Sequence, residues 1–271
     1  MFEYGNIYRI KPDYQLLIKH GFMPVDMHVH TNYSDSNLSL DSLVKIAKKY
    51  GIGFSVTDHN DVRANAKLAN HKNVLTIPGI EVTSRNYKDI LLYFYDVKEL
   101  IEFYEKYIKN NKIGNRGFNL NSTSLSIAEI FDSSLNYNCV RVLAHAYTKT
   151  PKHSARYFLL DKKLLKKLDC VEALNATLEK WRNANAVRFA RKVNKPIVGG
   201  SDSHTERLFG SVVTCTNALT TEEFLDYIKR GKSFIVGKEL SFFNRAITNA
   251  IIFKNNFWLS RKKLNEQLFG H

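Results

Sequence analysis

Histidine and acidic residues are concentrated in five short motifs, most of which close an apolar run. The motifs are Asp26-Met27-His28-Val29-His30-Thr31, which is followed by Asp35; Val56-Thr57-Asp58-His59-Asn60; Gly79-Ile80-Glu81-Val82-Thr83; Val142-Leu143-Ala144-His145; and Gly199-Gly200-Ser201-Asp202-Ser203-His204. Residues two apart on a strand point to the same side, so His28 and His30 can bind one ion. Asp202 and His204 repeat this spacing, which predicts a metal centre built from several strand ends.

The ligand types narrow the choice of metal. Imidazoles and carboxylates without thiolates suit Zn²⁺, Mn²⁺ or Fe²⁺ better than Ca²⁺, and Mg²⁺ is also possible. A single tetrahedral ion needs four ligands, so the eight candidates predict two or three ions. The candidate metal ligands are His28, His30, Asp35, His59, Glu81, His145, Asp202 and His204. Taken singly, each motif is equally typical of a hydrogen-bonded core histidine or a helix-capping acid; their shared position after apolar runs favours the metal.

The elements that would position these residues alternate along the chain. Short runs rich in Val, Ile, Leu and aromatic residues are typical of strands buried on both faces. They are Val25–Val29, Gly53–Thr57, Val74–Ile80, Asp89–Tyr95, Val140–Ala144, Cys170–Leu174 and Pro196–Gly199. Helices are expected at Ser39–Gly51, Leu178–Val193 and Thr221–Arg230 from apolar spacing and capping residues. The alternation predicts one α/β domain with a parallel sheet or barrel, whose carboxyl strand ends meet on one rim.

Composition sets broad limits on the class of protein. The 271 residues include 44% hydrophobic ones, enough for a core, and 40 Lys+Arg against 26 Asp+Glu give a net charge of +14. This balance favours anionic partners such as nucleic acid, other phosphate esters or an acidic membrane surface. Cys139, Cys170 and Cys215 are too sparse for a disulfide framework or thiolate site. We found no secretory signal and no membrane span, and therefore expect a cytoplasmic protein of unassigned oligomeric state.

No composition break divides the chain into two halves. We expect an N-terminal extension at residues 1–24, a barrel domain at 25–240 and a C-terminal appendage at 241–271 that packs on the barrel. The appendage mixes aromatic and basic residues within 251–263, which is also typical of a nucleic-acid or membrane-surface contact.

Taken in order, the motifs H-x-H-T…D, T-D-H-N, G-I-E-V-T, A-H and G-S-D-S-H resemble those of the PHP family, named for polymerase and histidinol phosphatase domains. The resemblance covers roughly residues 24–238. It implies an α/β fold, a distorted seven-stranded (β/α) barrel with a trinuclear metal site at the carboxyl strand ends, and phosphoester hydrolysis. By this resemblance His28, His30, Glu81 and Asp202 hold one ion, Glu81 and His145 a second, and Asp35, His59 and His204 a third.

The chain departs from the family pattern at two positions. Asp35 stands where many members have histidine, a substitution found in members of the nucleotide- and oligonucleotide-phosphatase type. Leu91 stands where many members have a histidine ligand, in the strand Asp89-Ile90-Leu91-Leu92-Tyr93. The second ion therefore lacks a protein ligand and is expected to be weak, labile or absent, although two ions are enough for hydrolysis.

Further residues are candidates for supporting roles. His204 or His145 could protonate the leaving alkoxide. Asp26 and Asp58 adjoin ligands and could orient imidazoles, although capping of helices or turns explains them equally well. Arg156, Arg85 and Arg182 could bind substrate phosphate through their planar guanidinium groups, whereas most basic residues of so basic a chain lie on the solvated surface.

Three functions are compatible with this pattern. The first is a metal-dependent phosphoesterase, a phosphatase or exonuclease, that acts on a nucleotide, an oligonucleotide or a small phosphorylated metabolite through metal-activated water. The second is a C–N hydrolase of the amidohydrolase type, which usually needs a bridging lysine that no strand end here supplies. The third is a nucleic-acid-binding or regulatory module with a partly degenerate metal site.

Overall fold

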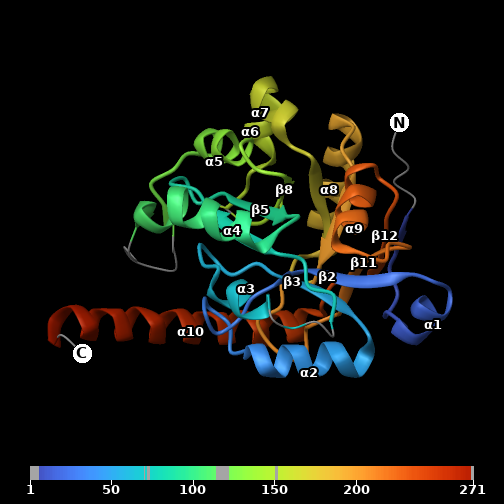
Figure 1. Ribbon diagram of the computed structural model, residues 1–271, viewed down its shortest axis with the longest axis horizontal. Coiled ribbons are helices and arrows are strands. Elements are labelled where there is room, and N and C mark those ends of the chain that lie inside the picture. Colours follow the sequence, from blue (N-terminus) through green and yellow to red (C-terminus); the bar gives the residue numbers. More distant parts are fainter. Residues whose placement is uncertain (1–5, 70, 72–73, 114–121, 150–151, 270–271) are drawn as a thin grey trace.

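The computed structural model describes residues 6–69, 71, 74–113, 122–149 and 152–269. The fold is mixed α/β, with two five-stranded sheets and helices packed around them (Figure 1). In the first sheet the order is β1 (Ile7–Tyr8), β12 (Phe234–Gly237), β11 (Val212–Thr216), β2 (Met23–Val29), β3 (Gly53–Val56). In the second it is β10 (Ile197–Gly200), β9 (Cys170–Asn175), β8 (Cys139–Leu143), β5 (Asp89–Phe94), β4 (Gly79–Thr83). A short pair, β6 (Lys112–Ile113) and β7 (Ser122–Thr123), forms a separate ribbon.

The helices follow the strands along the chain. They are α1 (Tyr14–Lys19), α2 (Leu40–Tyr50), α3 (Arg63–Leu68), α4 (Val97–Phe103), α5 (Ile127–Ser134), α6 (Ala155–Leu160), α7 (Lys162–Lys167), α8 (Lys180–Val193), α9 (Thr221–Lys229) and α10 (Phe242–Phe269). A π-helical turn (Tyr104–Ile108) and a 3₁₀ turn (Lys109–Asn111) extend α4. Among the described helices, none has the length and apolar character needed to cross a membrane.

The two sheets differ from the single seven-stranded barrel expected from the resemblance, because the described strands do not close into one ladder. The sheets meet instead at isolated bridges, Val29 with Ser203 and His59 with Glu81. At these junctions the chain leaves the extended conformation: Asn60 has φ 50° and Asp202 has φ 54°. A residue in the left-handed region cannot continue a strand ladder, so the pairing there is reduced to single bridges.

Strand β10 nevertheless lies very close to β2. A Cβ atom added at Gly200 would lie 2.5 Å from the Cβ of His28, so glycine is required for this approach. On the other side of β10, Gly199 lies against Leu174 O of β9 in the same way. The close approach brings the carboxyl end of β10 beside His28, which β2 carries.

Local sequence explains how the elements next to the site begin and end. Helix α2 starts where the Ser39 hydroxyl accepts a hydrogen bond from Ser42 N, and it stops at Gly51, whose φ is 68°. The predicted strand Val74–Ile80 is wrong over its first five residues, since β4 begins at Gly79. Pro78 directly precedes that start and has no N–H to donate, and the segment before it pairs with β3 only at the bridge of Thr76 with Phe54.

Side chains from both sheets form a buried layer beneath the site. They include Val25 and Met27 of β2, and Leu91 and Tyr93 of β5, all of which are buried. The hydroxyl of Tyr93 donates to Met27 O at 2.6 Å and thereby links the two sheets. This apolar floor supports the strand ends that carry the polar motifs.

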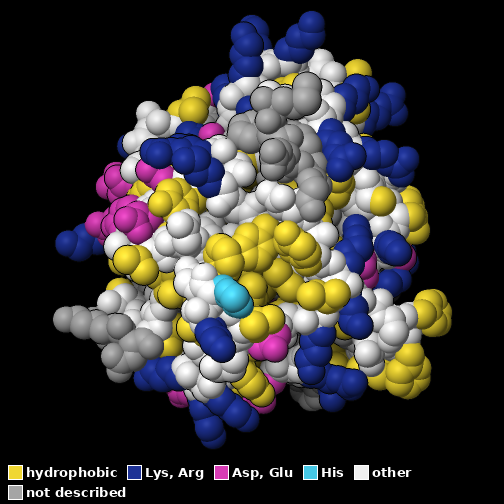
Figure 2. All heavy atoms as spheres, turned by 90° about the vertical axis from the view of Figure 1, so that its right-hand side faces the viewer, with side chains coloured by type: hydrophobic (Ala, Val, Ile, Leu, Met, Phe, Trp, Pro, Cys, Tyr) yellow, Lys and Arg dark blue, Asp and Glu magenta, His cyan; other side chains and the backbone are white. Residues whose placement is uncertain are grey.

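Two peripheral features complete the fold. Helix α10 runs along one side of the molecule and extends beyond it (Figure 1). Near its start Arg245 pairs with Glu179, and further along the Asn255 amide donates to Asp35 O at 3.1 Å. On another face α1 and β12 border a groove of about 670 Å³ lined by Leu16, Phe22, Phe234 and other side chains, where hydrophobic atoms gather (Figure 2).

Candidate metal centre

The carboxyl ends of strands from both sheets converge on one buried cup. His28 lies on β2, Glu81 on β4, and His30, His59 and His145 directly follow or lie close behind strands. Asp202 and His204 follow β10. The side chains of all eight candidate ligands are at least 85% buried. Asp202, at 15% exposed, is the most open of them. The structure therefore brings together every candidate ligand of the five motifs.

Four ligand atoms form the tightest group of the cup. His28 Nε2 and His30 Nε2 are 3.1 Å apart, and Glu81 Oε2 lies 3.4 Å from the first and 3.3 Å from the second. Asp202 Oδ1 lies 3.6 Å from His28 Nε2 and 3.3 Å from His30 Nε2. Ligands about 2.1 Å from a tetrahedral ion are about 3.4 Å from one another. The spacing of the His28, His30 and Asp202 atoms therefore fits one divalent ion, with Glu81 Oε2 beside both imidazoles.

A second group lies beside the first. Asp35 Oδ1 is 3.2 Å from His204 Nε2, and Asp35 Oδ2 is 3.8 Å from His59 Nε2. The opposite ring nitrogen of His59, Nδ1, is 3.2 Å from Glu81 Oε2. The rings of His30 and His204 stack at 4.4 Å, so the two groups form one continuous cup. The donor set of one carboxylate and two imidazoles suits a second divalent ion with room for water.

Glu81 also faces a third corner with its other oxygen. Its Oε1 lies 3.0 Å from His145 Nε2, which is 3.7 Å from Asp89 Oδ2. Lys152 Nζ lies 2.8 Å from the same Asp89 oxygen. Asp89 was not among the predicted ligands, although its place two residues before Leu91 on one strand puts both on the same face.

Electrostatics in the cup reflect the packing of acids against imidazoles. Burial alone would raise the pKa of Glu81, but His59 and His28 outweigh it and hold that pKa well below its usual value. Burial would lower the pKa of His30, but hydrogen bonds to Asp202 and Glu81 raise it to about 10. Asp89 and Glu81 likewise outweigh burial and raise the pKa of Lys152. The carboxylates thus favour the protonated form of His30, with which a metal ion would compete, whereas burial lowers the pKa of His59.

The backbone is strained at two candidate ligands. Asp202 has φ 54° and His145 has φ 24°, values that non-glycine residues rarely adopt. Such conformations cost on the order of 1–3 kcal/mol each and persist where the surroundings hold them. Asn175 Nδ2 and Thr177 Oγ1 both donate to Asp202 Oδ2, at 3.2 and 3.1 Å, and so hold the Asp202 side chain in place.

Glu172, which sequence reasoning missed, supports two of the imidazoles. Its Oε1 lies 2.9 Å from His28 Nδ1, the ring nitrogen that faces away from the cup. Its Oε2 accepts from the backbone N–H of His145 at 2.7 Å. A carboxylate behind a ligating imidazole fixes the ring orientation and raises its basicity. The available signal was an acid inside the apolar run Cys170–Leu174, on a strand buried along its whole length.

Asp26 and Asp58 act on backbone and hydroxyl groups instead of on imidazole rings. Asp26 Oδ2 accepts from Gly210 N at 2.8 Å and Oδ1 from Ser201 N at 2.8 Å, which holds the segment before Asp202. Burial raises the pKa of Asp26 to about 6. Asp58 accepts from the backbone N–H and hydroxyl of Thr31 at 2.7 and 2.6 Å, which holds the loop that leads to Asp35.

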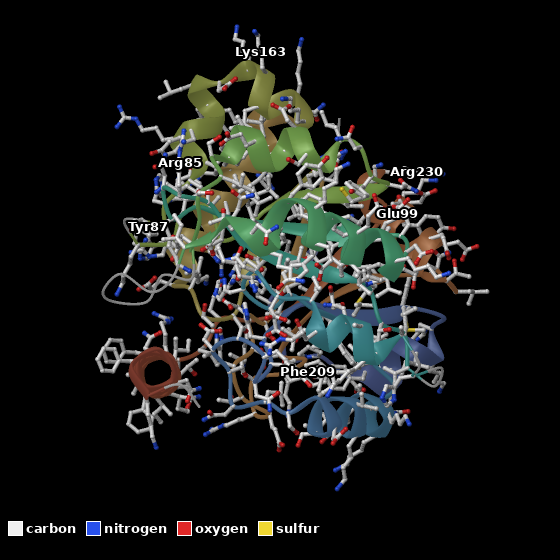
Figure 3. The ribbon with its side chains drawn as sticks, turned by 60° about the vertical axis from the view of Figure 1, so that its left-hand side comes forward. Arg85, Tyr87, Glu99, Lys163, Phe209 and Arg230 are labelled. Carbon is white, nitrogen blue, oxygen red and sulfur yellow. The ribbon has the colours of Figure 1, made fainter. Side chains whose placement is uncertain are left out.

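The three predicted phosphate-binding arginines have different surroundings. Arg182 donates to Glu179 Oε2 and to Tyr147 O, both at 2.6 Å, and stacks on Trp181. Arg156 is exposed on α6. Arg85 is exposed after β4 and lies with Tyr87 on the flank from which α10 projects (Figure 3).

Two family models match the chain. The family model of the PHP domain matches residues 26–178, more than half of the chain, and a PHP-associated model matches residues 180–233. Among curated proteins, none matches the sequence.

Solved structures show the same fold. The lesion-specific endonuclease Q from Pyrococcus furiosus superposes with a TM-score of 0.60 at 20% identity, over 79% of this chain and 57% of that one. Endonuclease Q in complex with a 27-mer duplex that has an abasic lesion at the active site gives 0.60 at 19%, over 80% and 60%. A two-domain protein from Bacteroides vulgatus, described as containing a predicted PHP-like metal-dependent phosphoesterase, gives 0.56 at 14%, over 92% and 73%. The chain thus spans less than two thirds of endonuclease Q, and the likeness is one of fold.

Proposed function

The chain belongs to the PHP domain family, as its motifs predicted, and from this premise we propose that it is a metal-dependent phosphoesterase. Its substrate is a nucleotide, an oligonucleotide or a small phosphorylated metabolite. The observation that carries the proposal is Glu81, whose Oε2 lies 3.3 Å from His30 Nε2 of one ligand group and 3.2 Å from His59 Nδ1 of the other, within one buried cup. A carboxylate so placed can bridge neighbouring cations, the arrangement used to hydrolyse phosphate esters.

In this proposal His28, His30, Glu81 and Asp202 would hold one ion, and Asp35, His59 and His204 would hold another, as their pairwise contacts allow. Mn²⁺, Zn²⁺ or Fe²⁺ suits these donors, with Mg²⁺ as a further choice. When bound, such ions supply a nucleophilic water near neutral pH and neutralise charge on the phosphate.

The chain's own residues position the substrate and provide a proton. His145 is the better of the two candidate acids, because its Nδ1 has no hydrogen-bond partner among the described residues. In His204 the corresponding nitrogen lies 3.0 Å from Asp202 O. Arg85 and Arg156 are exposed and remain candidates for binding a substrate phosphate, while Arg182 would first have to break its hydrogen bond to Glu179.

Two observations support a nucleic-acid or nucleotide substrate over a neutral one. The net charge of +14 favours a polyanion. The endonuclease Q complex holds duplex DNA on a fold similar to this one. The proposal includes a cytoplasmic location and the division into residues 1–24, 25–240 and 241–271.

A substrate screen with Mn²⁺ tests the proposal. Mononucleotides, bisphosphorylated nucleotides and short oligonucleotides are assayed for phosphate release and chain cleavage with wild type and His59→Ala. We expect wild type to act on at least one class and His59→Ala to lose most of that activity, since His59 Nε2 faces Asp35 and Nδ1 faces Glu81. His71→Ala, at an exposed position outside the cup, is the matched control. Equal turnover by wild type and His59→Ala would contradict the proposed site, and metal-independent DNA binding without turnover would favour a binding module.

A further inference from the structure

The corner of the cup around His145 differs from the others in its ligands. Leu91 lies directly opposite Glu81 in the β4–β5 ladder, so both side chains project from the same face. Leu91 is fully buried in the apolar floor and offers no atom to a cation. Polar atoms nevertheless face this corner: Glu81 and His145 have ligand atoms within 4.8 Å of one another and of His28, and Asp89 Oδ2 lies 3.7 Å from His145 Nε2.

Asp89 brings a negative charge that needs a partner. Its side chain is fully buried, one strand step from Leu91 on the same face. Its Oδ1 accepts from the Thr83 hydroxyl at 2.6 Å, which leaves Oδ2 directed toward His145. A buried carboxylate is stable only beside a cation or several donors.

Lys152 supplies that cation. It belongs to the segment after β8 that also carries His145, and its Nζ lies 2.8 Å from Asp89 Oδ2. The side chain is 28% exposed, so its stem passes from the rim into the cup. Asp89 Oδ2 is therefore shared between an ammonium group and the imidazole of His145, 3.7 Å away.

We propose that the ammonium group of Lys152 serves as the cation of this corner in place of a metal ion, so that the protein binds two divalent ions instead of three. Lys152 thereby supplies a positive charge at a corner where Leu91 offers no metal ligand. Its charge is fixed to the protein, and the corner stays neutralised when metal is scarce.

Counting bound metal tests this directly, without an activity assay. Wild type, Lys152→Met and the double variant Leu91→His/Lys152→Met are loaded with excess Mn²⁺, and the bound metal is measured by calorimetric titration and by elemental analysis after desalting. We expect two equivalents for wild type. Lys152→Met should gain one weaker equivalent in the titration, and the double variant should keep three after desalting, since a histidine at residue 91 restores a ligand beside Glu81.

Lys149→Met is the matched control, because Lys149 is an exposed lysine of the same segment. It should bind as many ions as wild type. Three equivalents in wild type, an unchanged count in Lys152→Met, or the same gain in Lys149→Met would each overturn the proposal. Circular dichroism and thermal melting establish that each variant is folded. If the double variant does not fold, the number of ions bound by Lys152→Met is the test.

The inference rests on the proposed function only for the expectation that the cup binds metal. The two can fail separately. A protein that shows these metal counts but hydrolyses no phosphate ester would sustain the role of Lys152 and remove the phosphoesterase. An active phosphoesterase with three bound ions would sustain the proposed function and remove the role of Lys152.

Discussion

The two oxygens of Glu81 face corners of opposite character. On the Oε2 side, His28, His30 and Asp202 offer atoms 3.1–3.6 Å apart, the spacing of a metal cage. On the Oε1 side, His145 and Asp89 share their corner with the ammonium group of Lys152. One carboxylate thus lies between a corner built for a metal ion and a corner that has its own positive charge.

The difference shows how a strand beneath a metal centre can keep its position when an apolar side chain stands at a ligand position. Leu91 packs in the apolar floor with Met27 and Tyr93, so the strand keeps its place under the cup. Asp89 and Lys152 then form an ion pair where a metal–imidazole bond would otherwise be. In the proposed arrangement the ammonium group of Lys152 supplies the positive charge that balances Asp89.

The largest loss of activity is expected for Glu81→Gln, because this side chain faces both corners. We expect kcat/KM for a phosphodiester such as bis(p-nitrophenyl) phosphate, or for whichever ester proves to be the substrate, to fall at least about 1,000-fold, which corresponds to about 4 kcal/mol. The amide keeps the volume of the acid but removes the charge that two imidazoles face. Glu222→Gln, at an exposed position on α9, should retain wild-type activity. A loss of less than tenfold in Glu81→Gln would separate Glu81 from the reaction.

Removing metal should take the ion from the corner on the Oε2 side of Glu81, while Lys152 stays in the corner on the Oε1 side. With ligand at about 100 times its dissociation constant, binding stabilises the folded state by about 2.7 kcal/mol. For a chain of this size, chelation should therefore lower the melting temperature by about 5–10 °C. Scanning calorimetry of the Mn²⁺-loaded protein, with and without EDTA, measures the change. Identical melting curves would mean that the folded cup does not bind Mn²⁺.

The smallest expected effect belongs to Glu172→Gln, which acts from behind the imidazoles. Glu172 holds His28 through the ring and His145 through its backbone N–H, so it touches both corners. Loss of such a carboxylate typically weakens metal binding 10–100-fold. Titration with Mn²⁺ should show this weakening while the number of ions stays unchanged. Glu206→Gln, an exposed acid near His204, is the control, and equal affinities in the two variants would assign Glu172 to packing alone.

Much of the fold could be predicted from the sequence, because strands buried on both faces are recognisable as apolar runs. The runs around Val25, Gly53, Asp89, Val140, Cys170 and Pro196 correspond to strands. Strands β11 and β12 were not predicted, and they lie between β1 and β2 in the first sheet. The two-sheet arrangement depends on where ladders stop, which residues such as Asn60 and Asp202 decide through their φ angles.

Most of the candidate ligands could be predicted because they stand at or near the end of an apolar run, where polarity changes abruptly. Glu172 and Asp89 lie within such runs, and a single acid there resembles an ordinary interruption of the pattern. Their partners, His28 and Lys152, are distant in sequence, so the pairing becomes visible only when the chain is folded. Lys152 in addition reaches the cup from a loop, whose path no periodicity describes.

The close contact of Gly200 with His28 has a practical consequence for anyone redesigning this protein. Because even one methyl group there would collide with the strand that carries the first imidazole, position 200 tolerates no library diversity.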